Sequence, residues 1–340
     1  MKGKLPQKQS IIEVYEDNFI TEIKRVSTFL KDYPYIGMDT EFPGTVYPCQ
    51  TYGPNFYYKY IKTNVDQLKL IQLGITLCNE KGETAPEGST WQFNLRFNLD
   101  KDNHSKESIS MLTECGIDFN LLKHKGIHHH TFAEYFFVSG LVLNDEVKWI
   151  SFNGFTDFAY LLRQILNMNL PEEESDFIDL LNLYFHEYYD IKILSLVNEN
   201  LKGGLNKIAQ QLNVERFGLV HQAGSDSLVT ADVFFQMENL GLITKEEIKN
   251  RKNTLFGIGK GADDKETFQY TVFSNNVANN NLSNLGGKTN NNIIVGNSAG
   301  YNGYFSNGNP ISPIVNGKFD YGNPHGKKYP PLNLVMAYGN

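Results

Sequence analysis

The chain has 340 residues, of which 41% are hydrophobic and 20% charged, and its 31 basic and 38 acidic side chains give a formal net charge of −7. This acidic balance argues against a protein that coats nucleic acid through bulk positive charge, but it is compatible with an enzyme that grips a few phosphates through metal ions. The cysteines are widely and irregularly spaced, the first residues hold no apolar signal-peptide core, and no apolar run reaches the roughly 18 residues of a membrane span. We therefore expect a reducing compartment and no membrane insertion.

The first part of the chain predicts one helix and three strands. Residues 1–8 are expected to be flexible, and apolar side chains between Ile11 and Leu30 recur at helical spacing. Strands are predicted for Tyr35–Phe42 and for Leu68–Leu77, whose apolar content suits burial on both faces. A turn then leads into Thr90–Phe97, which alternates like the second strand of a hairpin.

Helices dominate the next part, interrupted by predicted strands at Val147–Phe152 and Asp190–Leu194. The clearest helical patterns are Phe177–Phe185, Leu205–Leu212 and Asp226–Asn239. A hairpin-containing sheet followed by helix–strand alternation indicates one α/β domain, a mixed sheet flanked by helices, over residues 9–260.

The composition changes after about Lys265. Residues 271–340 contain 17 Asn and 10 Gly, and neither helical nor strand periodicity persists there. Such a polar segment cannot bury enough apolar surface to offset its chain entropy, so we predict a disordered tail over residues 261–340. Its scattered tyrosines and phenylalanines leave short linear binding motifs open as an alternative.

The strongest chemical signal is Asp39-Thr40-Glu41 at the end of an apolar strand. Positions i and i+2 of a strand project to the same face, so the two carboxylates should stand side by side. Adjacent unpaired carboxylates raise each other's pKa, and a divalent cation such as Mg²⁺ or Mn²⁺ removes the conflict. Because D-x-E also occurs by chance, this motif alone does not establish a metal site.

Two later segments add candidate residues. Asp157 follows a strand and a Gly turn and lies near a helix start, where it could equally be a cap or a first-turn acid that stabilises the helix dipole. His221 lies five residues before Asp226, across a Gly-Ser break that opens a helix. Alone, the pair could be a surface histidine and another helix cap.

Taken together, these positions spell D-x-E, D and H-x4-D, in the chain order of a DEDD-type 3′→5′ exonuclease on an RNase H-like fold. The sequence around these residues is more specific than the motif itself. The segments that carry a family resemblance are Met38–Gly44, Leu73–Gly74, Ser89–Asn94, Val147–Phe152, Asn169–Glu174, Leu201–Leu205 and His221–Asp226. Over roughly residues 9–260 the chain resembles the Caf/Pop deadenylases, the DEDD ribonuclease subunits of the Ccr–Not complex.

The resemblance implies a poly(A)-specific 3′→5′ exoribonuclease, an mRNA deadenylase that works by two-metal-ion hydrolysis and releases 5′-AMP. It implies that Asp39, Glu41, Asp157 and Asp226 hold two Mg²⁺ or Mn²⁺ ions. His221 would take the proton of the attacking water, a task that suits histidine because its ordinary pKa lies near neutral pH.

The resemblance also implies partners and a location. The partners would be the poly(A) tail of mRNA, the large platform subunit of the Ccr–Not complex and its leucine-rich-repeat nuclease subunit. Cytoplasmic residence, together with residence in the nucleus, would follow, in a role in mRNA turnover and translational repression.

One segment departs from the family pattern. The family usually reads S-F-H-S-G-Y-D where this chain has Ser151-Phe152-Asn153-Gly154-Phe155-Thr156-Asp157. The Asp is retained, but the absent His and the shifted Gly leave the geometry of this loop open.

Further residues have two interpretations each. Phe42 could pack on the terminal nucleotide or in the core, and Lys202, together with Lys207 and Arg216, could meet RNA phosphates or belong to a solvated face. The run of three histidines at 128–130 is interpreted as a surface loop rather than a metal site. Asp190 is interpreted as a structural acid at the start of a strand.

Two other functions remain open from the sequence. One is a DEDD exonuclease that acts on another substrate, such as the 3′ ends of small RNA or DNA. The other is a non-catalytic scaffold that bridges a second nuclease to the platform subunit, although all four acids and the histidine are present.

Overall fold

The computed structural model describes residues 10–48, 55–86 and 89–262, and the structural statements below concern these residues. The predicted flexible N-terminus, residues 1–8, lies outside them. So does the predicted disordered tail, residues 261–340, except for its first two residues.

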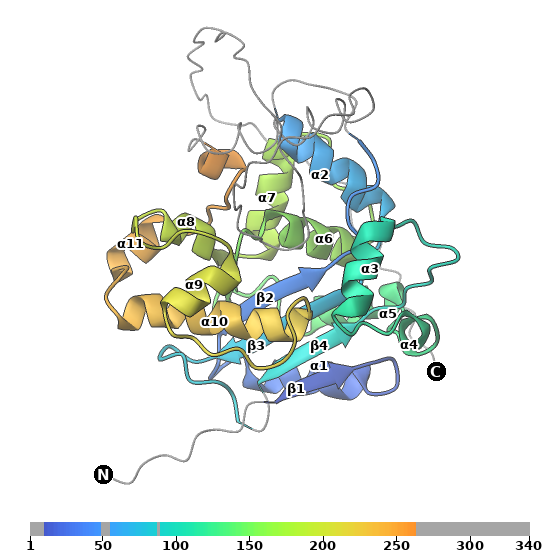
Figure 1. Cartoon of the computed structure of the whole chain (residues 1–340), viewed down its shortest axis with the longest axis horizontal. Coiled ribbons are helices and arrows are strands. Elements are labelled where there is room, and N and C mark those ends of the chain that lie inside the picture. The colour runs from blue at the N-terminus through green and yellow to red at the C-terminus, as the bar shows by residue number, and fades with distance from the viewer. Residues whose placement is uncertain (1–9, 49–54, 87–88, 263–340) are drawn as a thin grey trace, which may run out of the picture. The chain divides into compact units, whose positions relative to one another are not determined.

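A six-stranded mixed sheet forms the centre, with the strand order β1-β4-β3-β2-β5-β6 (Figure 1). The strands are β1 (Ile11–Val14), β2 (Tyr35–Glu41), β3 (Gln72–Cys78), β4 (Thr90–Asn94), β5 (Lys148–Ser151) and β6 (Glu187–Asp190). β3 runs antiparallel to both β2 and β4, whereas β1 pairs in parallel with β4, β5 with β2 and β6 with β5. The mixed-sheet α/β prediction is confirmed.

Helices lie on both faces of this sheet. They are α1 (Phe19–Phe29), α2 (Phe56–Gln67), α3 (Lys106–Glu114), α4 (Phe119–Lys125), α5 (His129–Val138), α6 (Phe155–Leu166), α7 (Glu174–Tyr184), α8 (Ile191–Ser195), α9 (Leu205–Gln211), α10 (Ala223–Asn239), α11 (Lys245–Asn250) and the 3-10 turn η1 (Gly259–Ala262). Within the described ranges, no helix combines the length and the apolar character needed to cross a membrane.

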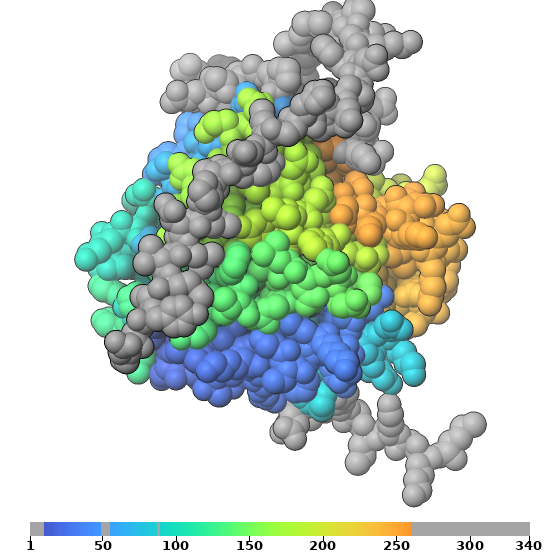
Figure 2. Space-filling view, turned by 180° about the vertical axis from the view of Figure 1, so that it is seen from behind, coloured from blue at the N-terminus to red at the C-terminus, as the bar shows by residue number. Residues whose placement is uncertain are grey.

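The two faces of the sheet differ in chemistry. One face is apolar, with Met38, Ile75 and Trp91 in the largest buried cluster, and the segments containing α1 and α5 cover it in the view from behind (Figure 2). The other face is crossed by α10, which contacts β2, β3 and β4 (Figure 1). Residues of β2, β3 and β4 on the α10 face include several buried polar side chains, and these position the site described below.

Two glycines allow α10 to lie directly on the strands. A Cβ atom on Gly37 would lie 2.5 Å from the carbonyl oxygen of Ser227, and one on Gly74 would lie 1.8 Å from that of Ala223. Any side chain at these positions would therefore force α10 away from β2 and β3. The close approach brings the start of α10 to the carboxyl end of β2.

Several predicted elements have different bounds in the structure. The strand predicted from Leu68 begins only at Gln72, the strand predicted to run to Phe97 ends at Asn94, and α7 begins three residues before the predicted Phe177. The helix predicted from Ile11 begins only at Phe19, because the β-branched segment Ile11–Val14 pairs with β4 as a strand. The strand predicted for Asp190–Leu194 is wrong: β6 ends at Asp190, whose side chain accepts a hydrogen bond from the Lys192 N–H and caps α8. Helix α10 begins at Ala223, three residues before its predicted start.

Candidate active site

The carboxyl end of β2 presents two acids to α10. Gly37 faces α10, and strand side chains alternate, so Asp39 and Glu41 project to the same face as Gly37. Glu41 is buried, with 5% of its surface exposed, whereas Asp39 keeps partial exposure. The side-by-side arrangement predicted from D-x-E is the observed one.

Asp157 reaches the same end of the sheet from α6. Strand β5 pairs with β2 only at Tyr35–Gly37, so among the described residues no strand pairs with the edge of β2 beyond that point on this side. There the Thr40 backbone N–H and hydroxyl donate to Asp157 Oδ1 at 3.0 and 2.5 Å. Gly154, not Asp157, caps α6, so Asp157 is a first-turn acid held by β2.

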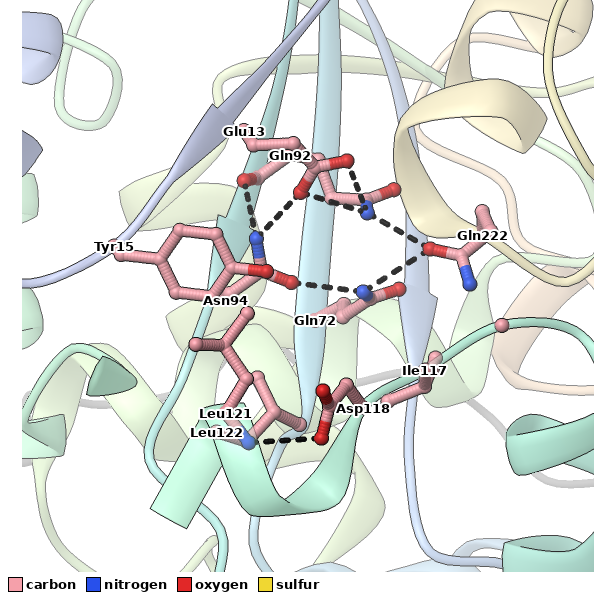
Figure 3. A pocket seen from close by; sticks show the side chains of 11 residues that line it. Glu13, Tyr15, Gln72, Gln92, Asn94, Ile117, Asp118, Leu121, Leu122 and Gln222 are labelled. Atoms are coloured by element: carbon pink, nitrogen blue, oxygen red, sulfur yellow. Dashed lines mark hydrogen bonds between the residues drawn. The ribbon is translucent and has the colours of Figure 1, made fainter. Parts of the chain in front are cut away.

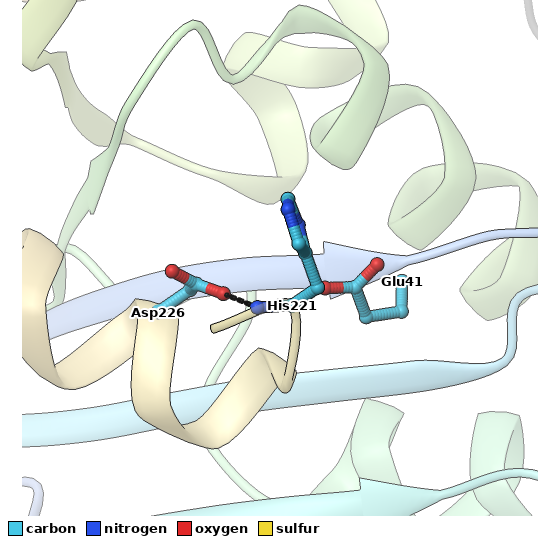
Figure 4. Close-up of side chains that lie close together, drawn as sticks. All are labelled: Glu41, His221 and Asp226. Carbon is cyan, nitrogen blue, oxygen red and sulfur yellow. Dashed lines mark hydrogen bonds between the residues drawn. The ribbon is translucent and has the colours of Figure 1, made fainter. Parts of the chain in front are cut away.

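Asp226 comes from the first turn of α10 and has both carboxylate oxygens engaged. Arg216 Nη2 donates to Oδ1 at 2.7 Å, and the His221 backbone N–H donates to Oδ2 at 2.9 Å (Figure 4). His221 has a φ of 58°, in the left-handed region, where histidine is one of the more tolerated residues. The short segment before α10 thus holds His221 and Asp226 together.

The acids lie close enough to one another for their charges to raise the pKa of Asp39 and Glu41. Burial raises the pKa of Asp39 well above its usual value, and the charges of Asp226, Asp157 and Glu41 raise it further, against a lowering by Arg216. Glu41 is raised in pKa by burial and then by Asp226 and Asp157. Burial raises the pKa of Asp157 to about 6, although its hydrogen bonds from Thr40 oppose the increase.

This donor set fits hard divalent cations. One potential ligand atom each from Glu41, His221 and Asp226 lies within 4.8 Å of the other two (Figure 4). Carboxylates that repel one another and are partly desolvated are stabilised when a cation neutralises them, and carboxylate oxygens are the ligands that Mg²⁺ and Mn²⁺ prefer. The geometry leaves His221 able to act either as a base or as a ligand.

Asp190 fixes the loop that departs from the family pattern. Its carboxylate accepts hydrogen bonds from the backbone N–H groups of Asn153 (2.7 Å), Gly154 (3.3 Å), Lys192 (2.9 Å) and Phe256 (2.9 Å). Asn153 adopts a φ of 57°, which asparagine tolerates. The altered loop therefore still begins α6 so that Asp157 reaches β2, and Asp190 is a structural acid at a strand end rather than at a strand start.

A network of side-chain amides holds the start of α10 next to these acids (Figure 3). The Ala223 N–H donates to Gln72 Oε1 at 3.3 Å, and the Gly224 N–H donates to Gln92 Oε1 at 2.8 Å. Gln222 is the N-cap residue, but its side chain makes no capping bond, so side chains of β3 and β4 cap the helix instead. Gln92 Nε2 in turn donates to Gln222 Oε1 at 2.8 Å. The helix that carries Asp226 is thereby fixed to β3 and β4.

The remaining amides extend this network to β1. Gln72 Nε2 donates to Asn94 Oδ1 at 2.8 Å, Asn94 Nδ2 donates to Glu13 Oε2 at 2.8 Å, and Gln222 Nε2 donates to the Cys115 carbonyl at 2.8 Å. A cavity of about 290 Å³ lies against the network, and its other walls are formed by Tyr15, Gly116, Ile117, Asp118, Leu121 and Leu122. The amide donors facing this cavity are largely satisfied by one another, which indicates a brace rather than a ligand site.

The other predicted contact residues have mixed outcomes. Phe42 stacks on Tyr160 with 4.8 Å between ring centroids and packs against the main core, as one of its two interpretations requires. Lys202 and Lys207 are exposed and form no ion pair within the described part of the chain. Arg216 lies against Asp226, so the structure gives it a partner other than RNA.

The surface-loop interpretation of the histidine run is wrong in part. His128 and His130 are exposed, but His128 occupies the N-cap position of α5, without a side-chain capping bond, and the other two begin that helix. His129 is partly buried and pairs with Gln164 Oε1 and the Arg96 carbonyl. Burial lowers the pKa of His129, so it serves as a neutral structural group.

Sequence reasoning missed several residues that build the site. Thr40 stands inside the D-x-E motif, and Gln72 and Gln92 are buried polar residues of β3 and β4. A polar residue on the buried face of a strand needs a hydrogen-bond partner, and this is the signal that could have identified the two glutamines.

Known proteins with similar sequences belong to one ribonuclease family. The model of the CAF1 family ribonuclease matches residues 14–139 and 137–234. The chain is 44% identical over 235 residues to CCR4-NOT transcription complex subunit 7 of Caenorhabditis elegans, which covers 67% of this chain and 76% of that protein. It is 40% identical over 263 residues to the poly(A) ribonuclease pop2 of Schizosaccharomyces pombe, which covers 76% of this chain and 77% of that protein.

Solved structures share the fold. The structure of S. pombe Pop2p in its Mg²⁺- and Mn²⁺-bound form has a TM-score of 0.69 and 40% identity, over 73% of this chain and 99% of that one. A chain of the structure of the yeast NOT1 MIF4G domain co-crystallised with CAF1 gives a TM-score of 0.63 and 26% identity, over 75% of this chain and all of the matched one. The RNase H-like prediction is confirmed.

Proposed function

This chain belongs to the CAF1 family of ribonucleases, and we propose that it is a poly(A)-specific 3′→5′ exoribonuclease, an mRNA deadenylase that releases 5′-AMP. The observation that carries the proposal is the convergence of Asp39, Glu41, Asp157 and Asp226 beside His221, from β2, α6 and the start of α10. The likeness to a poly(A) ribonuclease, at 40% identity, supports the substrate class.

The four acids would hold two divalent cations, Mg²⁺ or Mn²⁺. The relative whose structure contains these ions supports this choice, and so do the burial and the repulsion that raise the pKa of Asp39 and Glu41. When bound, the cations supply charge neutralisation for the phosphate and a lowered pKa for a bound water. Thr40 orients Asp157 for this task, because it occupies Oδ1 and leaves Oδ2 without that bond.

His221 would act as the general base. Its side chain lies beside Glu41 and Asp226, and its backbone N–H is tied to Asp226, so the imidazole is held at the edge of the acidic cluster (Figure 4). A base at this place can take the proton of the water that attacks the last phosphodiester. Phe42 and Lys202 are proposed contacts of the RNA, Phe42 through the part of its side chain that stays exposed and Lys202 through its exposed ammonium.

We also propose that the protein is a catalytic subunit of the Ccr–Not complex in mRNA turnover and translational repression. The relatives named for that complex, and the one solved with a NOT1 domain, support the large platform subunit as a partner. The leucine-rich-repeat nuclease subunit, and residence in the cytoplasm and the nucleus, follow from family membership alone.

The test is a time course of product sizes on 5′-labelled RNA. We expect stepwise shortening of an oligo(A) tail in Mg²⁺ or Mn²⁺, release of 5′-AMP, and no reaction in EDTA. A tail of mixed sequence should be shortened more slowly. Equal rates on both tails, or faster trimming of DNA, would instead indicate a DEDD exonuclease of another specificity. Binding of the platform subunit without any hydrolysis would indicate a scaffold.

A further inference from the structure

Arg216 lies in the segment between α9 and α10 and joins these two helices. Its Nη2 atom donates to Asp226 Oδ1 at 2.7 Å and also to Asn206 Oδ1, and its Nη1 atom donates to Ser225 Oγ at 2.8 Å. The side chains of Arg216 and Asp226 are only 18% and 10% exposed. The guanidinium is therefore held by α9 and α10 at once, and its fork is fixed in direction.

This grip leaves Asp226 with little rotational freedom. Arg216 occupies Oδ1, and the His221 N–H occupies Oδ2 at 2.9 Å, so the carboxylate is held from two sides. Each carboxylate oxygen can accept a second interaction, and the remaining lone pairs are available to a cation shared with Glu41 and His221, whose ligand atoms lie within 4.8 Å of that of Asp226. A ligand fixed in this way loses less entropy when a cation binds.

We propose that Arg216 is a positioning residue for the cation site, which orients Asp226 as a ligand and stays bound to it when cations are present. The inference rests on the proposed function, because it concerns the cations of that site. It replaces the interpretation of Arg216 as a phosphate contact, since three of its donor bonds are already made within the protein.

The alternative is that Arg216 serves only as a counter-charge for the acids. Its positive charge does lower the pKa of Asp39. The two roles predict opposite signs. A positive charge close to a cation site repels the cation, so loss of a pure counter-charge would tighten divalent binding. Loss of an orienting partner weakens binding, typically by about 10–100-fold in metal affinity.

The experiment measures Mn²⁺ binding to the full chain without RNA, from the electron paramagnetic resonance signal of free Mn²⁺. We expect Arg216→Gln to raise the dissociation constant by about 10–100-fold. Arg216→Lys should restore binding only in part, because an ammonium cannot reach Asp226 and Ser225 in the same fork geometry. The control is Lys207→Gln, which removes one exposed positive charge from α9 and should leave Mn²⁺ binding unchanged.

A second variant keeps the charge and removes an anchor. Asn206→Ala retains the guanidinium but deletes one of its partners, and it should weaken Mn²⁺ binding in the same direction by a smaller factor. The Mg²⁺ concentration for half-maximal trimming should rise in Arg216→Gln, whereas kcat at saturating Mg²⁺ should recover much of its value. Circular dichroism spectra of the variants check that the fold is kept.

Three results would overturn the inference: tighter or unchanged Mn²⁺ binding in Arg216→Gln, full recovery by Arg216→Lys, or unchanged binding in Asn206→Ala. Failure of the proposed function is visible separately, in the unsubstituted protein, which would then neither bind Mn²⁺ nor shorten oligo(A). In that case the inference fails with it.

Discussion

Two polar clusters lie side by side on the α10 face of the sheet, and they differ in how their groups are satisfied. The amide network of Gln72, Gln92, Asn94 and Gln222 pairs donors with acceptors. The acidic cluster, at the carboxyl end of β2, brings together four acids, with Arg216 as a counter-charge beside Asp226. Burial raises the pKa of Asp39, Glu41 and Asp157, and other acids of the cluster raise that of Asp39 and Glu41 further. The first cluster is complete within the protein, whereas we propose that a cation completes the second.

The difference separates stability from function. A buried donor or acceptor that has its partner costs little, so the amide network can fix α10 on β3 and β4. Buried carboxylates that lack a counter-charge oppose folding, because their charged form is disfavoured. The acids are therefore retained at the expense of stability in the metal-free protein, and each prediction below tests one side of this division.

The largest effect is expected for Asp39→Ala. The substitution removes one acid from the cluster, so we expect no measurable trimming of oligo(A) in Mg²⁺. In EDTA the free energy of unfolding, measured in urea, should be unchanged or higher, since one repelling charge is gone. Glu134→Ala, an exposed acid of α5, is the matched control and should change neither quantity. Trimming at the normal rate by Asp39→Ala would refute the assignment of the acids.

The next effect is expected for His221→Ala. Loss of a general base typically lowers the rate by about 10²–10⁴-fold, and we expect the affinity for Mg²⁺ or Mn²⁺ to stay nearly unchanged. Calorimetric titration of the variant with Mn²⁺ separates the two roles that the geometry allows. If the variant no longer bound the metal, His221 would be a ligand instead.

The third prediction concerns pH and Asp157. Burial raises its pKa from the ordinary value of 3.8 to about 6 in the folded protein. Between these pH values the folded protein therefore binds more protons than the unfolded chain. The free energy of unfolding of the metal-free protein should fall as the pH rises from about 4 to 6. The difference corresponds to roughly 3 kcal/mol at most.

Asp157→Asn, which does not titrate, isolates this contribution. In EDTA the unsubstituted protein should lose stability as the pH rises from about 4 to above 6, and Asp157→Asn should lose less. The free energy of unfolding of the variant should therefore increase relative to that of the unsubstituted protein. Added Mg²⁺ should favour the unsubstituted protein instead. A constant difference between the two proteins across this range would show that the pKa of Asp157 is not raised.

The smallest effect is expected for Gln92→Leu in the amide network. The Gly224 N–H would lose its acceptor and Gln222 would lose a donor, and a buried group left without a partner costs roughly 1–3 kcal/mol. Urea unfolding should show this loss with and without Mg²⁺, unlike the effects in the acidic cluster. Gln210→Leu, on the exposed side of α9, should stay within about 0.5 kcal/mol of the unsubstituted protein. Equal stability of the two variants would show that the network does not stabilise the fold.

The local sequence pattern predicted correctly those elements whose apolar spacing fits only one type of secondary structure. β2 and the side-by-side Asp39 and Glu41 follow from strand alternation, and β3 and β4 were expected as a hairpin. Ile11–Val14 was mispredicted as helix because its apolar residues fit either period, and only the pairing with β4 selects the strand. The family resemblance, not the spacing, linked Asp157, His221 and Asp226 to the D-x-E motif.

The sequence by itself identified the candidate side chains, because residue type and strand alternation are local properties of the chain and the family resemblance connects the distant motifs. The tertiary structure decided how those side chains are held. Thr40 and Asp157 are 117 residues apart, and Gln92 and Gly224 are 132 apart. Their hydrogen bonds exist only because β2, α6, β4 and α10 meet at one end of the sheet. Contacts over such separations depend on the packing of the whole domain, so no short segment of sequence predicts them.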